Sequence, residues 1–239
     1  MALFFGYDPG GFGSQERPKP ASGVAAMHID ENGRFENVKT CTVVDAAKAL
    51  SWFREQPFAM ALGVDTLLCW SFRGHRSCDD RLRARYPEAG NSVLSQNSLY
   101  SSMTINGVLV AAKAHRELGL PLVESHPKLL IAAEGGHLCR RDDESKALCW
   151  AKAGSLLSAQ DGSAELIRQY NELLESEDEH RADALVAAWC ASRWYFRDSG
   201  WTTDLYGVDS HDVDSHDPLY FPAGPAVYPW PEPIALSDG

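Results

Sequence analysis

The sequence predicts an α/β protein in which a mixed five-stranded sheet is flanked by helices, and three observations support this fold class. Short apolar runs of strand length recur along the first half of the chain. The segment Glu31-Asn32-Gly33 is typical of a tight turn between two antiparallel strands. The later apolar runs are separated by helical patterns, which are the usual crossovers between parallel strands.

Local signals define the first half of the chain. We expect strands over residues 2–8, 23–30 and 34–44, a loop rich in Gly, Pro and Lys over 10–22, and a helix over 45–56. The third strand shows the two-residue period of a strand in Val38, Thr40, Thr42 and Val44. Asp45 precedes the helix as its N-cap, and Pro57 ends it.

The second half alternates helices with two further strands. We expect strands over 58–65 and 120–124, and helices over 92–118, 127–135, 142–158, 164–175 and 177–196. The pair Asn106-Gly107 could divide the first of these helices in two, and Gly119 stands where glycine commonly follows a helix. Residues 1–197 are therefore expected to form one domain. Residues 198–239, rich in Pro, Tyr and Trp, are expected to pack on it as an irregular tail.

Composition excludes several classes of protein. Hydrophobic residues make up 44% of the 239 residues and charged residues 23%, which is typical of a globular domain. No apolar run reaches the ~20 residues that span a bilayer, so we expect no membrane partner. The N-terminal apolar stretch lacks a basic start and is broken at Asp8-Pro9-Gly10, which argues against a secretory signal. The six cysteines form no Cys-x-x-Cys pair, which favours reduced thiols and a cytoplasmic location.

Acidic residues close three of the apolar runs, namely Asp8, Asp65 and Glu124. A buried strand that ends in a carboxylate places that group at an edge of the sheet, where ligands bind. His180 and Asp183 lie three residues apart in an apolar helix and so share one helix face. Each has a structural alternative, such as a turn at Asp8 or a cap at Asp65, yet together they predict a site for a divalent cation.

The order of elements and these acidic positions resemble the RNase H superfamily. The opening Gly6-Tyr7-Asp8-Pro9-Gly10 resembles that of the Holliday-junction resolvase branch, and the segment from His180 to Ala188 is similar to the final helix of that branch. More closely, the chain resembles a family of uncharacterised predicted nucleases with an RNase H fold. The matching segments are Gly63-Val64-Asp65-Thr66, Cys78-Asp79-x-x-Leu82-Arg83, Val123-Glu124-Ser125-His126-Pro127 and Asp183–Ala188. The likeness spans residues 2–196, and the branch normally has Glu where this chain has Asp65.

The resemblance implies a nuclease that hydrolyses phosphodiester bonds with two metal ions, Mg²⁺ or Mn²⁺. Such ions prefer carboxylate oxygens and stand about 3.5–4 Å apart. By position, Asp8 would bridge both ions, while Asp65 and Asp183 would each bind one. His180 would be a ligand or move a proton to the leaving group. Glu124 would be an additional ligand, or would orient His126.

The expected partner is nucleic acid, either DNA or RNA, and a homodimer is left open by the sequence. The formal charge of −11 is unfavourable for phosphate binding, which depends on basic patches. One segment runs against that charge, and its candidate nucleic-acid-binding residues are Arg73, Arg76, Arg81 and Arg83. The alternative interpretation of this segment is a solvated helix face with internal ion pairs.

The sequence leaves two alternatives to a nuclease. An ATPase or sugar kinase of the same fold usually needs two such domains and a second Gly-rich phosphate turn, which this chain lacks. A non-catalytic interaction module fits the acidic charge, but crowded carboxylates cost stability and persist mainly for function. The repeat Val208–Asp212 and Val213–Asp217 contains two His-Asp pairs and is read as a duplicated loop rather than a metal site.

Overall fold

The computed structural model describes residues 1–10, 22–71, 76–87, 101–133, 163–176, 178–196, 201, 203–206 and 220–231. The strands are β1 (Ala2–Asp8), β2 (Ser22–Ile29), β3 (Phe35–Val43), β4 (Ala61–Val64), β5 (Leu122–Glu124), β6 (Thr203–Asp204), β7 (Ala226–Val227) and β8 (Pro229–Trp230). The helices are α1 (Ala46–Arg54), α2 (Ser77–Arg85), α3 (Ser101–Leu118), α4 (Pro127–Ala133), α5 (Ser163–Glu175) and α6 (Glu179–Phe196). In this described part, no helix is long and apolar enough to span a membrane.

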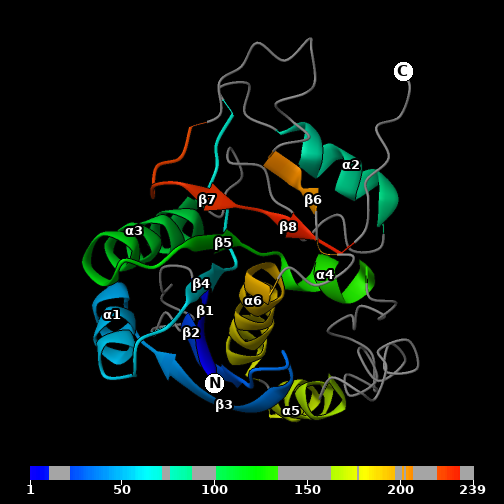
Figure 1. Cartoon of the computed structure of the whole chain (residues 1–239). Helices are drawn as coiled ribbons and strands as arrows, with labels where there is room; N and C mark the ends of the chain where they lie inside the picture. The colour runs from blue at the N-terminus through cyan, green and yellow to red at the C-terminus, as the bar shows by residue number, and fades with distance from the viewer. Residues whose placement is uncertain are drawn as a thin grey trace.

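The main sheet is mixed, as the sequence predicts, but it has six strands instead of five. Its order is β3-β2-β1-β4-β5-β7 (Figure 1). The strands β1, β2 and β3 are antiparallel neighbours, whereas β4 lies parallel to β1, β5 to β4 and β7 to β5. The additional strand, β7, comes from the C-terminal segment and is only two residues long, which is too short to leave a periodic pattern in the sequence.

Two apolar cores cover the two faces of the sheet, and β1 contributes to both. Phe4 packs in the core with α5 and α6, while Phe5 and Tyr7 pack in the core with α1 and α3. This alternation is the expected result of the two-residue period of a strand. Helices on both faces explain why β1 is almost entirely apolar.

Several local predictions are confirmed. Asp45 is the N-cap of α1, and its side chain accepts a hydrogen bond from the backbone N–H of Lys48 at 2.7 Å. In contrast, α3 continues without a break through Asn106-Gly107. A Cβ atom at Gly107 would lie 2.5 Å from Cγ2 of Thr66, so close packing accounts for the glycine at this position. The expected helix over 142–158, residues 92–100 of the helix expected over 92–118, and the repeat over 208–217 lie outside the described residues.

The C-terminal segment also pairs with itself and with the domain. The strands β6 and β8 form a two-stranded antiparallel sheet, and the backbones of Trp70 and Tyr220 bridge to each other. Tyr228 and Trp230 are fully buried in the same apolar core that includes residues of α2 and α4. Parts of the segment expected to be irregular are therefore built into the domain.

Three glycines on adjacent strands bring α6 against the sheet. A Cβ atom on Gly23 of β2 would lie 1.8 Å from the carbonyl oxygen of His180, and one on Gly6 of β1 would lie 1.8 Å from that of Ala184. The same helix crosses β4 at Gly63, with similar geometry. Because only glycine permits this approach, the backbone of α6 packs directly on three strands. This contact sets the height of His180 and Asp183 above the strand ends.

Candidate metal centre

Three aspartates converge at one edge of the sheet. Asp8 is the last residue of β1, Asp65 follows β4, and Asp183 lies one turn into α6. One carboxylate oxygen from each lies within 4.8 Å of the others. The sequence predicted this convergence, and the structure brings the three residues together.

The parallel pairing of β1 with β4 explains why two of the carboxylates meet. Tyr7 is in register with Val64, so Asp8 and Asp65 are the next residues at the same edge. The backbone N–H of Asp65 donates to the carbonyl of Tyr7 at 2.9 Å, which extends the ladder by one bond. Parallel strands end at a common edge, and ligands bind there in open α/β sheets.

Burial and mutual repulsion make the ionised aspartates costly. Asp8 is 2% and Asp183 is 4% exposed, whereas the Asp65 side chain is 22% exposed. Burial raises the pKa of all three carboxyls, and most strongly that of Asp65 and Asp183. The charges of Asp8 and Asp183 raise the pKa of Asp65 further. Like charges this close need either protons or a cation between them.

Two carboxylate oxygens have no hydrogen-bond donor among the described residues. Oδ1 of Asp8 and Oδ1 of Asp183 are both buried, and neither accepts a hydrogen bond from any residue that the structure describes. A buried carboxylate normally accepts several bonds, so an unpaired oxygen at this position requires another partner. Hard oxygen donors of this kind are the ligands that Mg²⁺ and Mn²⁺ prefer. The residues present therefore fit a divalent cation.

Two basic side chains border the three aspartates. His180 shares a hydrogen bond with Asp8, between Nδ1 and Oδ2 at 2.5 Å, and its side chain is 39% exposed. This hydrogen bond raises the pKa of His180. Lys128 of α4 pairs with Glu179 at 2.6 Å. Although burial alone would lower the pKa of Lys128, the charges of Asp183 and Glu179 raise it.

Glu124, expected among the catalytic carboxylates, belongs to a neighbouring buried network instead. Its oxygens accept hydrogen bonds from the backbone N–H of Leu68 at 2.6 Å and from the hydroxyl of Tyr206. The guanidinium of Arg76 donates to both of its oxygens, at 3.0 and 2.6 Å. Burial would raise the pKa of Glu124, but Arg76 and His126 lower it to about 2. An acid with this many donors has little capacity left for a metal ion.

Arg76, expected to bind nucleic acid, lies in the same buried network as Glu124. Its side chain is buried, and it also donates to both oxygens of Asp79, at 2.8 and 2.7 Å. The guanidinium lies 5.8 Å from the ring centre of Tyr206 and 5.6 Å from that of Tyr228. Arg76 therefore neutralises two buried acids. If it turned outward to contact a phosphate, both acids would be left as unpaired buried charges.

The other candidate arginines of that segment differ from Arg76 in their surroundings. Arg81 and Arg83 are half-buried on α2, and Arg83 pairs with Asp80 at 2.8 Å, as the alternative of internal ion pairs predicts. Arg73 lies outside the described residues.

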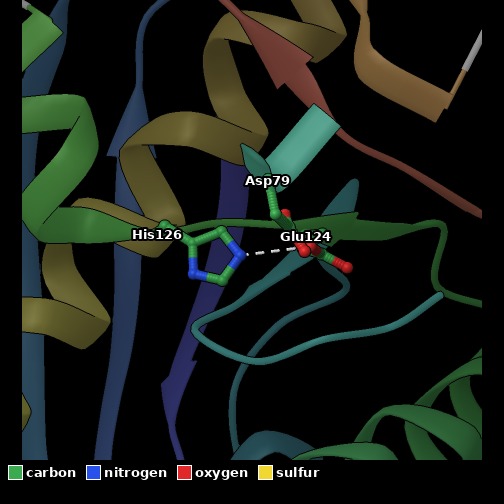
Figure 2. Close-up of side chains that lie close together, drawn as sticks. All are labelled: Asp79, Glu124 and His126. Atoms are coloured by element: carbon green, nitrogen blue, oxygen red, sulfur yellow. Dashed lines mark hydrogen bonds and ion pairs between the residues drawn. The ribbon is translucent and has the colours of Figure 1, made fainter. Parts of the chain in front are cut away.

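A second group of possible metal ligands is already satisfied. Asp79, Glu124 and His126 offer ligand atoms within 4.8 Å of one another, and Figure 2 shows their side chains converging. Arg76 bonds to both of these acids, so its positive charge already occupies the role that a cation would have. We therefore assign the two acids of this group a structural role.

Sequence reasoning did not anticipate the contribution of Tyr206. Its hydroxyl donates to Glu124 across 82 residues, and no local pattern marks a contact at that separation. His126 was anticipated only as a residue that Glu124 could orient. It does bond Glu124, from Nε2 to Oε1 at 3.1 Å.

No family model, curated protein or solved structure matches this chain. The fold and site define an α/β protein with a mixed six-stranded sheet and an acidic centre at the ends of two parallel strands.

Proposed function

We propose that this chain is a divalent-metal-dependent phosphodiester hydrolase with an RNase H-like fold, acting on nucleic acid. The observation that carries the proposal is the convergence of Asp8, Asp65 and Asp183 within 4.8 Å. These acids come from the first strand, the fourth strand and the last long helix. The resemblance to the RNase H superfamily implies metal ligands on these same three elements.

The charges around the aspartates favour a cation as the resident group. Two buried carboxylates and the half-buried carboxylate of Asp65 lie close together, and two of their oxygens accept no hydrogen bond from the described residues. Lys128 and His180 offset part of the repulsion, yet the pKa of Asp65 and Asp183 remains raised. When bound, two Mg²⁺ or Mn²⁺ ions would stabilise the charge that develops on a phosphodiester and activate water.

His180 is the residue best placed to move a proton. It lies at the solvent-facing border of the centre, and its Nδ1 is held by Asp8. A hydrogen bond on one ring nitrogen orients the ring and leaves the other nitrogen for exchange with water or a leaving group. Because Asp8 raises the pKa of His180, the ring keeps its proton to a higher pH than an unpaired histidine.

Nucleic acid is proposed as substrate on the family resemblance, with Arg81 and Arg83 as candidate phosphate contacts on α2. Arg83 retains a partly exposed side chain beside Asp80. A net charge of −11 means that any phosphate contact depends on such local groups and on the bound cations.

Calorimetric titration of Mn²⁺ tests the centre before any substrate is known. We expect binding to the wild type and none to the Asp8→Asn/Asp183→Asn double variant. Asp80→Asn is the matched control, because Asp80 is a half-exposed aspartate outside the centre, and it should bind like the wild type. Equal binding in all three proteins would contradict the proposal.

Hydrolysis is then measured with bis(p-nitrophenyl) phosphate, which requires only cleavage of a phosphodiester, and with single-stranded, duplex and branched DNA and RNA. We expect Mn²⁺-dependent cleavage that the double variant lacks. Binding without cleavage of any of these substrates would favour the interaction module, and nucleoside triphosphate hydrolysis would favour the ATPase or kinase alternative.

A further inference from the structure

The imidazole of His126 connects the Glu124 network to the aspartates. Its Nε2 lies 3.1 Å from Oε1 of Glu124, and its Nδ1 lies 3.9 Å from Oδ1 of Asp65. Figure 2 shows the ring with one nitrogen on Glu124 and the other turned away from that carboxylate. His126 is 6% exposed, so this orientation is set inside the protein.

Contacts of Glu124 decide which nitrogen carries the proton. Glu124 already accepts from the Leu68 N–H, from the Tyr206 hydroxyl and twice from Arg76. A carboxylate surrounded by donors acts only as an acceptor, so Nε2 of His126 must donate to it. In the neutral ring, the lone pair is then on Nδ1, the nitrogen nearest Asp65.

The ring cannot easily leave this position. The ring centre of Tyr228 lies 5.3 Å from that of His126, and Glu124 is itself held by Arg76. A histidine that binds a metal through one ring nitrogen usually donates the N–H of its other ring nitrogen to a carboxylate. The carboxylate then fixes both the tautomer and the direction of the ring.

We propose that Nδ1 of His126 is a nitrogen ligand of the divalent ion held by Asp65, and that this ligand makes the centre prefer a transition-metal dication over Mg²⁺. The inference rests on the proposed function, since it needs an ion at the three aspartates. The unpaired oxygens of Asp8 and Asp183 are the independent observation that a ligand belongs there. Imidazole nitrogen suits first-row transition metals, whereas Mg²⁺ takes oxygen ligands almost exclusively.

Electron spin-echo spectroscopy of the Mn²⁺-loaded protein tests the inference directly, because it detects nitrogen bound to the ion. We expect histidine nitrogen modulation in the wild type and in His180→Gln, and its loss in His126→Gln and His126→Asn. The amides of both His126 variants can donate to Glu124 as the ring does, so the network has a replacement donor. Circular dichroism checks that each variant is folded.

Competition between metals gives the second readout. Removal of the ligand should weaken Mn²⁺ binding about 10–100-fold and change Mg²⁺ binding much less. Nitrogen modulation that survives both His126 variants, or its absence from the wild type, would overturn the inference and leave the three-aspartate centre standing. Mn²⁺ binding that does not depend on Asp8 and Asp183 would instead remove the proposed function itself.

Discussion

Gly63 of β4 lies directly beneath the carbonyl oxygen of Ala187 in α6, at a distance where a Cβ atom would stand 1.9 Å from that oxygen. The obstacle is backbone, which cannot rotate away as a side chain could. Because Asp65 follows Gly63 by two residues and Asp183 precedes Ala187 by one helical turn, the same contact sets how closely these two carboxylates approach.

Gly63→Ala should therefore destabilise the protein and weaken the metal centre together. Alanine in place of glycine within a strand would ordinarily stabilise by about 0.5–1 kcal/mol. Here we expect a loss of about 3 kcal/mol, because α6 must move off the sheet. Urea denaturation measures the stability, and Mn²⁺ titration measures the centre. Unchanged stability would contradict the close packing of α6 on β4.

Asp183→Asn should stabilise the metal-free protein, and more so at higher pH. Burial is the main cause that raises the pKa of Asp183 above its ordinary 3.8, and the charge of Asp8 adds to it. A raised folded-state pKa means that stability falls as pH rises from about 3.8 through that pKa. Asparagine removes this loss, so the variant should exceed the wild type by about 1 kcal/mol or more at pH 8.

Thermal unfolding of both proteins between pH 4 and pH 8 tests this expectation. The difference in melting temperature between Asp183→Asn and the wild type should shrink toward pH 4. It should reverse when Mn²⁺ is present, because the bound ion stabilises only the wild type. A variant that is strongly destabilised at every pH would mark Asp183 as a structural residue.

Glu124→Gln should show the opposite dependence on pH. The pKa of Glu124 falls from 4.5 to about 2, since Arg76 and His126 outweigh the effect of burial. A lowered folded-state pKa provides stability that is present above pH 4.5 and lost as pH falls toward 2. We expect the variant to be about 3 kcal/mol less stable at pH 7, because Arg76 loses one of its two buried partners.

The difference in free energy of unfolding between the wild type and Glu124→Gln, measured by urea denaturation, should narrow as pH falls from 4.5 toward 2. Glu117→Gln is the matched control. Glu117 pairs with Arg54 on the surface, where its side chain is 42% exposed, and such pairs contribute at most about 1 kcal/mol. A constant gap at all pH values would show that Glu124 acts through packing alone.

Tyr206→Phe should reveal how far the C-terminal segment belongs to the domain. The variant keeps the ring but removes the hydroxyl that donates to Glu124. Losing a hydrogen bond to a buried charge costs about 1.5–3 kcal/mol. Tyr220→Phe serves as the control, because Tyr220 is 53% exposed. The free energy of unfolding of this control variant should stay within about 0.5 kcal/mol of that of the wild type. Equal effects of the two substitutions in urea denaturation would contradict the role of the hydroxyl.

Much of the fold could be predicted because its signals are local. Apolar runs of strand length mark β1 and β4, and the cap at Asp45 marks the start of α1. The sixth strand could not be predicted, because β7 has two residues and exists only through its pairing with β5. The helix break expected at Asn106-Gly107 is absent, because tertiary context can override the low helix propensity of glycine. Glycine stands there because a Cβ atom would lie 2.5 Å from Cγ2 of Thr66.

The candidate site divides in the same way. From the sequence alone, it follows that Asp8 and Asp65 end strands and that His180 and Asp183 share one helix face, since strand and helix periods are local properties of the chain. Only the tertiary structure decides which acids remain for a cation. Arg76 bonds Glu124 across 48 residues and neutralises it, while Oδ1 of Asp8 and Oδ1 of Asp183 have no donor in the part of the chain that the structure describes. Such pairings depend on which elements pack together, and the free energy of a buried charge is set by the neighbours that packing supplies.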